Sequence, residues 1–234
     1  MLSNTEALLH LIDTYQLGDA VRFVLENNPS QTLPYHSTHH ALTVMLVVNE
    51  AWQYDQKLFY SKRSEDMGDT PKELLLAALF HDYNYQVFER GQDHHNIQAA
   101  LQGWKAYWTQ SPGGTEMSYS TVHTLIRSTE VPHTYHRDYD GYMQMVCCLQ
   151  DADFSCHSTD TIFGPLIGIK GEYFDKMDWP KYLEESMDWY GSVLYKTSWG
   201  RNIAHLLRMK TLNNWKRLQQ LVFPEAITNK ETQQ

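Results

Sequence analysis

The strongest hydrophobic pattern in the chain is an uninterrupted apolar run from Leu74 to Phe80. A helix that is apolar on every side is typical of a buried position, so this run predicts a central core helix. Thr70 and Glu73 have the spacing of a capping box, and Pro71 suits the first helical turn. The run stops at His81-Asp82, and two ionisable residues at the end of a buried helix need partners.

Helical periodicity recurs along the rest of the chain, and no strand-like alternation is sustained, so the sequence predicts an all-α protein. We expect a single domain over residues 1–234, with a core at about 30–160 and a C-terminal helical extension at about 161–225. A helix expected at about 162–174 is interrupted by Gly164-Pro165 and by Gly168. The other main helices are expected at about 41–58, 118–129, 138–155, 183–194 and 203–222.

Composition narrows the class of protein. The net charge of -9 argues against unspecific binding to nucleic acid or to an anionic membrane. Three cysteines without a CxxC pair indicate neither a disulfide framework nor a thiolate zinc site. The N-terminus lacks the basic start of a signal peptide, and no apolar run is long enough to span a membrane, so we expect a cytoplasmic protein. The oligomeric state stays open, and a homodimer is one option.

Histidine and aspartate stand near the ends of three predicted core helices, as His40, His81-Asp82 and Asp153. Antiparallel neighbours in a helical bundle bring such ends together. Imidazole and carboxylate ligands suit Mn, Fe, Co, Ni, Zn or Mg, so we expect one or two divalent metal ions. Asp151 and Asp153 lie about 200° apart around a helix, so only one of them can face a given ion. His36 would share a face with His40 if that helix begins early enough.

Further groups are candidates for a second metal site or for the surroundings of the first. His94 and His95 fall in the first turn of a predicted helix, where the helix dipole disfavours a cation and so favours the neutral, metal-binding form of histidine. His123 and Asp151 complete this set of candidates.

Several blocks of residues 35–155 resemble the HD superfamily of metal-dependent phosphohydrolases. His81-Asp82 after LLLAALF resembles the signature doublet, and DFS at 153–155 resembles the family's final Asp-Leu-Ser. YHSTHHALTV is similar to the Tyr-His-Asn-x-x-His block of cyclic-nucleotide phosphodiesterases and related bacterial HD hydrolases. DHHNIQAA and IRSTE are similar to blocks of the predicted HD phosphohydrolases, but His94-His95-Asn96 stands where an Asn-Glu pair is usual. The resemblance implies that His36 is a general acid and that Asp82 is both a metal ligand and a catalytic residue. It also implies three further metal ligands, namely His40, His81 and Asp153.

The expected activity is hydrolysis of a small phosphorylated substrate by a metal-activated water. A nucleotide is expected, as a mono- or triphosphate or a cyclic form. Four residues are candidates for contacts to the base or the phosphate: Tyr83, Tyr85, Lys170 and Arg127. Two other classes stay open. One is a di-iron oxygenase on the same helical fold, which needs six His or Asp ligands, and the other is a non-catalytic, metal-stabilised binding module.

Overall fold

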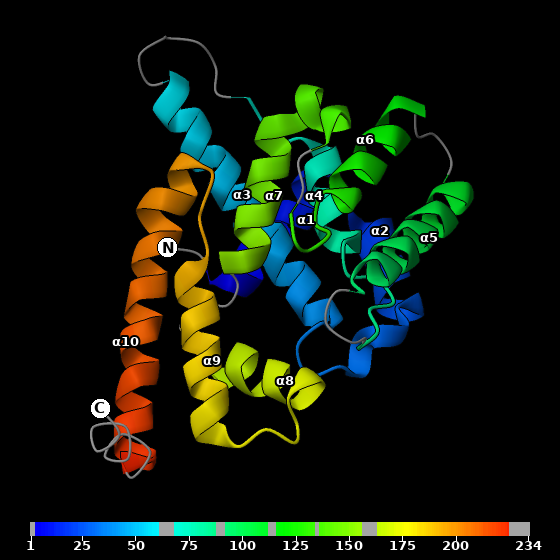
Figure 1. Ribbon diagram of the computed structural model, residues 1–234. Helices are drawn as coiled ribbons and strands as arrows, with labels where there is room; N and C mark the ends of the chain where they lie inside the picture. Colours follow the sequence, from blue (N-terminus) through cyan, green and yellow to red (C-terminus); the bar gives the residue numbers. More distant parts are fainter. Residues whose placement is uncertain are drawn as a thin grey trace.

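All regular secondary structure in the described part of the chain is helical, which confirms the all-α prediction (Figure 1). The structure is a computed structural model that describes residues 3–60, 68–87, 92–111, 116–133, 136–155 and 163–224. The boundary expected between residues 160 and 161 lies outside these ranges. The α-helices are α1 (Asn4–Thr14), α2 (Gly18–Asn27), α3 (Thr38–Tyr60), α4 (Lys72–Phe80), α5 (His94–Gln110), α6 (Glu116–Arg127), α7 (Met143–Ser155), α8 (Phe163–Tyr173), α9 (Trp179–Ser192) and α10 (His205–Val222).

The predicted core helix is α4, and every residue from Leu74 to Phe80 is buried. It packs against α3 on one side and α6 on another, with α2, α5 and α7 completing its surroundings. The Phe80 ring meets the Trp104 ring of α5 edge to face, with centroids 5.5 Å apart. Because α4 has no solvent-facing side, its C-terminal end lies inside the protein, where His81 and Asp82 follow.

The capping box predicted at the start of α4 is wrong. Thr70 Oγ1 donates to Asn49 Oδ1 at 2.7 Å and accepts from Gln53 Nε2 at 3.1 Å, so it is bonded to α3. The Glu73 carboxylate accepts from Ser118 Oγ at 2.8 Å, on α6. Both side chains that the local pattern assigned to the cap are therefore hydrogen-bonded to neighbouring helices. Helix α4 begins without a side-chain cap.

Other expected helices also differ in extent or continuity. Helix α3 begins at Thr38, so His36 lies just before it and does not share a helical face with His40. The helix expected from residue 138 is a 3₁₀ turn, η2 (Arg137–Tyr142), followed by α7. Helix α8 runs without a break, and its proline falls in the first turn, where no intrahelical hydrogen bond is lost.

A second hydrophobic cluster lies between α9, α10 and the segment that joins them. Its largest buried side chains are Tyr182, Tyr190, Trp199 and Trp215. Helices α9 and α10 run side by side along one edge of the molecule, and α8 lies near one end of α9 (Figure 1). A π-helical turn, η4 (Gly200–Ala204), leads into α10. Within the described chain, no helix has the combined length and apolar character that crossing a membrane requires.

Candidate metal centre

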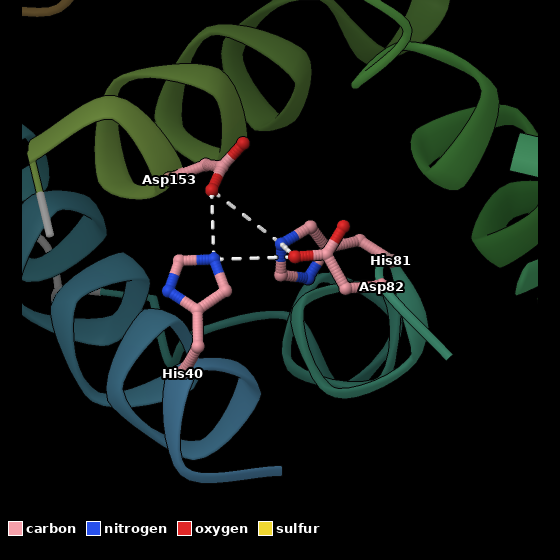
Figure 2. A group of neighbouring side chains, drawn as sticks. All are labelled: His40, His81, Asp82 and Asp153. Carbon is pink, nitrogen blue, oxygen red and sulfur yellow. Dashed lines mark hydrogen bonds and ion pairs between the residues drawn. The ribbon is translucent and has the colours of Figure 1, made fainter. Parts of the chain in front are cut away.

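Three helix ends meet at one point in the core. His40 lies in the first turn of α3, His81 caps the C-terminus of α4, Asp82 follows it, and Asp153 lies in the last turn of α7. Figure 2 shows the four side chains converging from these elements. One ligand atom from each lies within 4.8 Å of all the others, so the group could bind a metal ion. The predicted convergence of helix ends is therefore present.

The spacing of the four ligand atoms suits a small divalent ion. His40 Nε2 lies 3.3 Å from Asp82 Oδ2 and 3.1 Å from Asp153 Oδ1. His81 Nε2 lies 3.1 Å from Asp82 Oδ2 and 3.5 Å from Asp153 Oδ1. Two ligands bound at about 2.1 Å and separated by about 90–110° at the ion stand roughly 3.0–3.4 Å apart. Three of these four distances lie in that range, and the fourth exceeds it by about 0.1 Å.

The tautomer of His81 also suits a metal ligand. Its Nδ1 lies 2.8 Å from the Ala78 carbonyl oxygen, which can only accept, so Nδ1 carries the proton. In the neutral ring, Nε2 then has a free lone pair, which a metal requires. Nε2 is buried and makes no well-aligned hydrogen bond to any described residue, although two carboxylates lie near it. A nitrogen aimed between two carboxylates rather than at either one fits a bound cation.

Without a cation, the four groups hold one another in charged form. Burial opposes charge on both carboxyls, but the hydrogen bond from His40 and the nearby imidazole of His81 keep the pKa of Asp153 well below its usual range. The charge on His81 and the hydrogen bond from His40 likewise lower the pKa of Asp82. Burial opposes charge on His40 too, yet its bonds to the two carboxylates raise its pKa. Two ionised carboxylates in a buried site need positive charge, which a divalent ion supplies.

His36 lies beside this group, although it is not on α3. Its ring centroid is 5.8 Å from that of His40. Its Nδ1 is 2.5 Å from Glu172 Oε2 on α8, and its ring stacks on Tyr85 with centroids 3.8 Å apart and planes within 6°. Glu172 did not stand out in the sequence, since it lies 136 residues from His36 in a segment without a recognisable motif.

The candidates for a second metal site do not join the four ligands. His94 and His95 are exposed in the first turn of α5, with their rings 3.9 Å apart. His123 is half-buried on α6, where its ring lies 6.1 Å from that of Tyr119. Among the residues that the structure describes, the four-ligand group is the only cluster of three or more His, Cys, Asp or Glu side chains suited to a metal.

Asp151 and Asp153 face opposite ways, as the helical geometry requires. Asp153 points to the ligand group, whereas Asp151 is buried against the segment between α9 and α10. Its carboxylate accepts from the backbone N–H groups of Lys196 and Thr197 and from Thr197 Oγ1, at 2.7–3.0 Å. Asp151 therefore anchors the C-terminal part of the chain to α7, and it is not a neighbour of the metal ligands.

Of the four candidate substrate contacts, two are bonded to other residues. Lys170 Nζ donates to the carbonyl oxygens of Phe174 and Asp175 at the end of α8, at 3.1 and 3.4 Å. Arg127 pairs with Asp138 at 3.6 Å. Neither side chain contacts the ligand group.

The two tyrosines that follow Asp82 have different positions. Tyr83 packs against α5 and donates its hydroxyl to the Asn27 carbonyl oxygen at 2.7 Å. Tyr85 lies against His36 instead, and its hydroxyl is bonded to the hydroxyl of Tyr173 on α8. Tyr85 is thus the one member of the four candidates that touches a candidate catalytic residue.

A third carboxylate near the ligand group was not singled out by the sequence. Asp93 accepts from the Val131 backbone N–H at 2.7 Å and from Asn96 Nδ2 at 3.4 Å, which ties the start of α5 to the loop after α6. Burial raises its pKa, and the negative charges of Asp82 and Asp153 add to that shift.

Comparison of the chain with protein-family models, with curated proteins and with solved structures found no match. The class that fold and site define is thus an all-α protein with a buried two-histidine, two-aspartate group that could bind a metal ion.

Proposed function

We propose that the chain is a metal-dependent phosphohydrolase of the HD type that acts on a small phosphorylated substrate, with a nucleotide as the first expectation. The observation that carries this proposal is the convergence of His40, His81, Asp82 and Asp153 at one buried point. Their order along the chain is the order in the resembling family. The four residues that the resemblance implies as metal ligands are thus the ones that meet in space.

The four side chains would hold a divalent ion, which, when bound, supplies an activated water and a partner for phosphate charge. Four protein donors leave positions free in a five- or six-coordinate shell. The carboxylates of Asp82 and Asp153 would neutralise the charge of the ion, and the Nδ1–H bond from His81 to Ala78 fixes the direction of the His81 Nε2. The ligand set arrives pre-arranged because each donor sits at a helix end held by the core.

His36 is the candidate proton donor for the leaving oxygen. It lies next to the ligand group without belonging to it. Its Nδ1 is bonded to a carboxylate, and a carboxylate stabilises the positively charged ring that a general acid must be before it gives up its proton. General acid catalysis of this kind contributes roughly 10²–10⁴-fold to rate. The pairing with Glu172 thus supports the role that the resemblance implies for His36.

The two rival classes have less support in the described residues. A di-iron oxygenase needs a second set of ligands, and the histidines that would supply it lie outside the four-ligand group. A purely structural metal site has no use for a histidine held by a buried carboxylate beside the metal ligands. Both classes are tested by the same experiment as the proposal.

The decisive experiment is a screen of the metal-stripped protein reloaded separately with Mn, Fe, Co, Ni, Zn or Mg. Phosphate or nucleoside release is measured for nucleoside mono- and triphosphates, cyclic nucleotides and p-nitrophenyl phosphate, and oxygen uptake is followed with the iron form. We expect phosphoester hydrolysis that is lost in Asp82→Ala. The matched control is Asp69→Ala, an exposed carboxylate ahead of α4. Oxygen uptake without hydrolysis, or metal binding without any turnover, would overturn the proposal.

A further inference from the structure

Helix α8 approaches the segment before α3 more closely than a side chain would allow. A Cβ atom added at Gly168 would lie 2.9 Å from the Pro34 carbonyl oxygen and 3.0 Å from Tyr35 Cβ. Both distances are at or below the limit for real Cβ contacts, and one neighbour is rigid backbone. Glycine at this position therefore sets how near α8 lies to the backbone that carries His36.

One helical turn after this contact, Glu172 bonds to three donors of the same segment. Its Oε1 accepts from the backbone N–H groups of Tyr35 and His36, at 2.5 and 3.0 Å. Its Oε2 lies 2.5 Å from His36 Nδ1, and the Glu172 side chain is only 1% exposed. A carboxylate that already accepts two N–H bonds is ionised, so it accepts from Nδ1 too. Nε2 of His36 is thereby left as the nitrogen that can exchange its proton.

The next residue of α8 constrains the same ring from its face. Tyr173 and Tyr85 are joined through their hydroxyl groups, and the Tyr85 ring lies flat against the His36 ring. The Tyr173 ring also meets the His36 ring at 87°, with centroids 6.0 Å apart. Two consecutive residues therefore fix different properties of His36: Glu172 its protonated nitrogen and Tyr173, through Tyr85, its plane.

We propose that α8 is a positioning element of the catalytic site, in which Gly168 sets the approach, Glu172 fixes the tautomer of His36, and Tyr173 holds Tyr85 against the ring. This inference rests on the proposed function, because it assigns α8 to the proton donor of that reaction. It also gives the C-terminal part of the chain, which begins with α8, a further structural role. That part does not only cover the core; its first helix completes the arrangement around His36.

The placement of His36 is tested without any reaction. In the metal-stripped full-length protein, ¹⁵N–¹H correlation spectra of the imidazole ring report which nitrogen of His36 carries a proton. We expect Nδ1 to be protonated in the wild type and both neutral tautomers to be populated in Glu172→Ala. Glu172→Gln has a single oxygen for the backbone N–H groups of Tyr35 and His36 and presents its amide NH2 to Nδ1, so the ring proton should move to Nε2. A wild-type ring protonated on Nε2 alone, or a Glu172→Ala ring with an unchanged pattern, would overturn the proposal.

The catalytic consequence is tested with a matched pair of glycines on α8. A Cβ at Gly171 meets only Pro34 Cγ, at an ordinary 3.8 Å, so Gly171→Ala should behave as the wild type. Gly168→Ala should lower the rate on a phosphoester with a poor leaving group at least about tenfold. This loss would be part of the roughly 10²–10⁴-fold rate enhancement that general acid catalysis contributes. The loss should shrink on p-nitrophenyl phosphate, and the metal content should not change.

Tyr173→Phe keeps the ring and removes the hydroxyl, so it tests the same constraint if Gly168→Ala does not fold. It should show the same dependence on the leaving group in a smaller degree. Equal deficits for good and poor leaving groups in both variants would overturn the role of α8. If no phosphoester is turned over at all, the proposed function fails, while the NMR result still decides whether α8 fixes His36.

Discussion

At the scale of single residues, positions close together in the sequence have different structural roles. Asp151 and Asp153 have the same side chain, both on α7, yet one bonds to backbone N–H groups and the other faces two histidines. The sequence alone could state that only one aspartate faces the site, because helical geometry separates them by about 200°. It could not show what the other one binds, since its partners lie 45 and 46 residues further along.

The first prediction separates these two aspartates by substitution to asparagine. Asp153→Asn removes a metal ligand, so it should lose metal and turnover. Asp151→Asn places N–H donors against other N–H donors, so it should lower the free energy of unfolding by about 1–3 kcal/mol while the metal is retained. Elemental analysis and urea denaturation of both variants provide the two measurements. The opposite pattern would show that the assignment of the aspartates is reversed.

The second prediction concerns His36 and His40, which lie side by side and have different proposed roles. His40→Ala should lose metal and all turnover. His36→Ala should keep its metal and lose roughly 10²–10⁴-fold in rate on substrates with poor leaving groups. Parallel metal analysis and steady-state kinetics check both statements. Loss of metal in His36→Ala would mean that His36 is itself a ligand.

The third prediction is a pH effect at His133, whose ring lies against that of Phe154 with centroids 4.6 Å apart and planes tilted by 30°. Burial lowers the pKa of His133 to about 4, and the positive charge of Lys196 adds to this shift. The unfolded chain takes up a proton near pH 6.5 while the folded protein does not, so stability is lost as the pH falls from about 6.5 towards 4.

His133→Phe removes this proton uptake, so its free energy of unfolding should fall less than that of the wild type between pH 7 and pH 5. The difference should be about 1–2 kcal/mol. Urea denaturation at the two pH values measures it, with the exposed His10→Phe on α1 as control. Equal pH dependence in the wild type and both variants would refute the prediction.

At the scale of elements, the sequence predicted α4 well because its pattern is determined by burial alone. An uninterrupted apolar run has one favourable environment, and the structure places α4 there. The details at its start were wrong because Thr70 and Glu73 have partners on α3 and α6 that no local pattern reveals. The expected break at Gly168 was wrong for a related reason, since that glycine serves a contact between segments and not a turn.

The fourth prediction tests whether Thr70 acts within α4 or across to α3. Thr70→Ala and Asn49→Ala each remove one side of the bond between these residues. If the bond stabilises the contact of the two helices, the loss of stability in the double variant should be smaller than the summed losses of the two single variants. The difference should be about 0.5–1.5 kcal/mol. Urea denaturation of the wild type, the two single variants and the double variant measures the four free energies of unfolding that this comparison needs. Additive losses of stability would show that the bond between Thr70 and Asn49 does not stabilise the contact of α4 with α3.

At the scale of the whole molecule, one candidate ion would join three core helices. His40 and Asp153 lie 113 residues apart in the chain, and an ion between them would fix α3, α4 and α7 to one another. An ion that binds only the folded protein stabilises it by mass action. The sequence alone pointed to all four candidate ligands but not to Glu172, whose distance along the chain from His36 hides it from any local pattern.

The fifth prediction follows from this linkage. Removal of the metal by a chelator should lower the unfolding temperature, and re-addition at about 100 times the dissociation constant should restore about 2.7 kcal/mol of stability. Calorimetry across a range of metal concentrations measures the effect. Asp82→Ala should show no response and Asp69→Ala a full one. A response of equal size in Asp82→Ala would place the ion elsewhere.

The position of Glu172 on α8 also has a consequence for the order in which the site is assembled. A ribosome delivers His40, His81, Asp82 and Asp153 before it reaches the helix that holds His36. The nascent chain would thus possess its complete ligand set while its proposed proton donor still lacks a fixed orientation. On the proposed function, all four candidate ligands of the ion would therefore be synthesised before the helix that orients the proton donor.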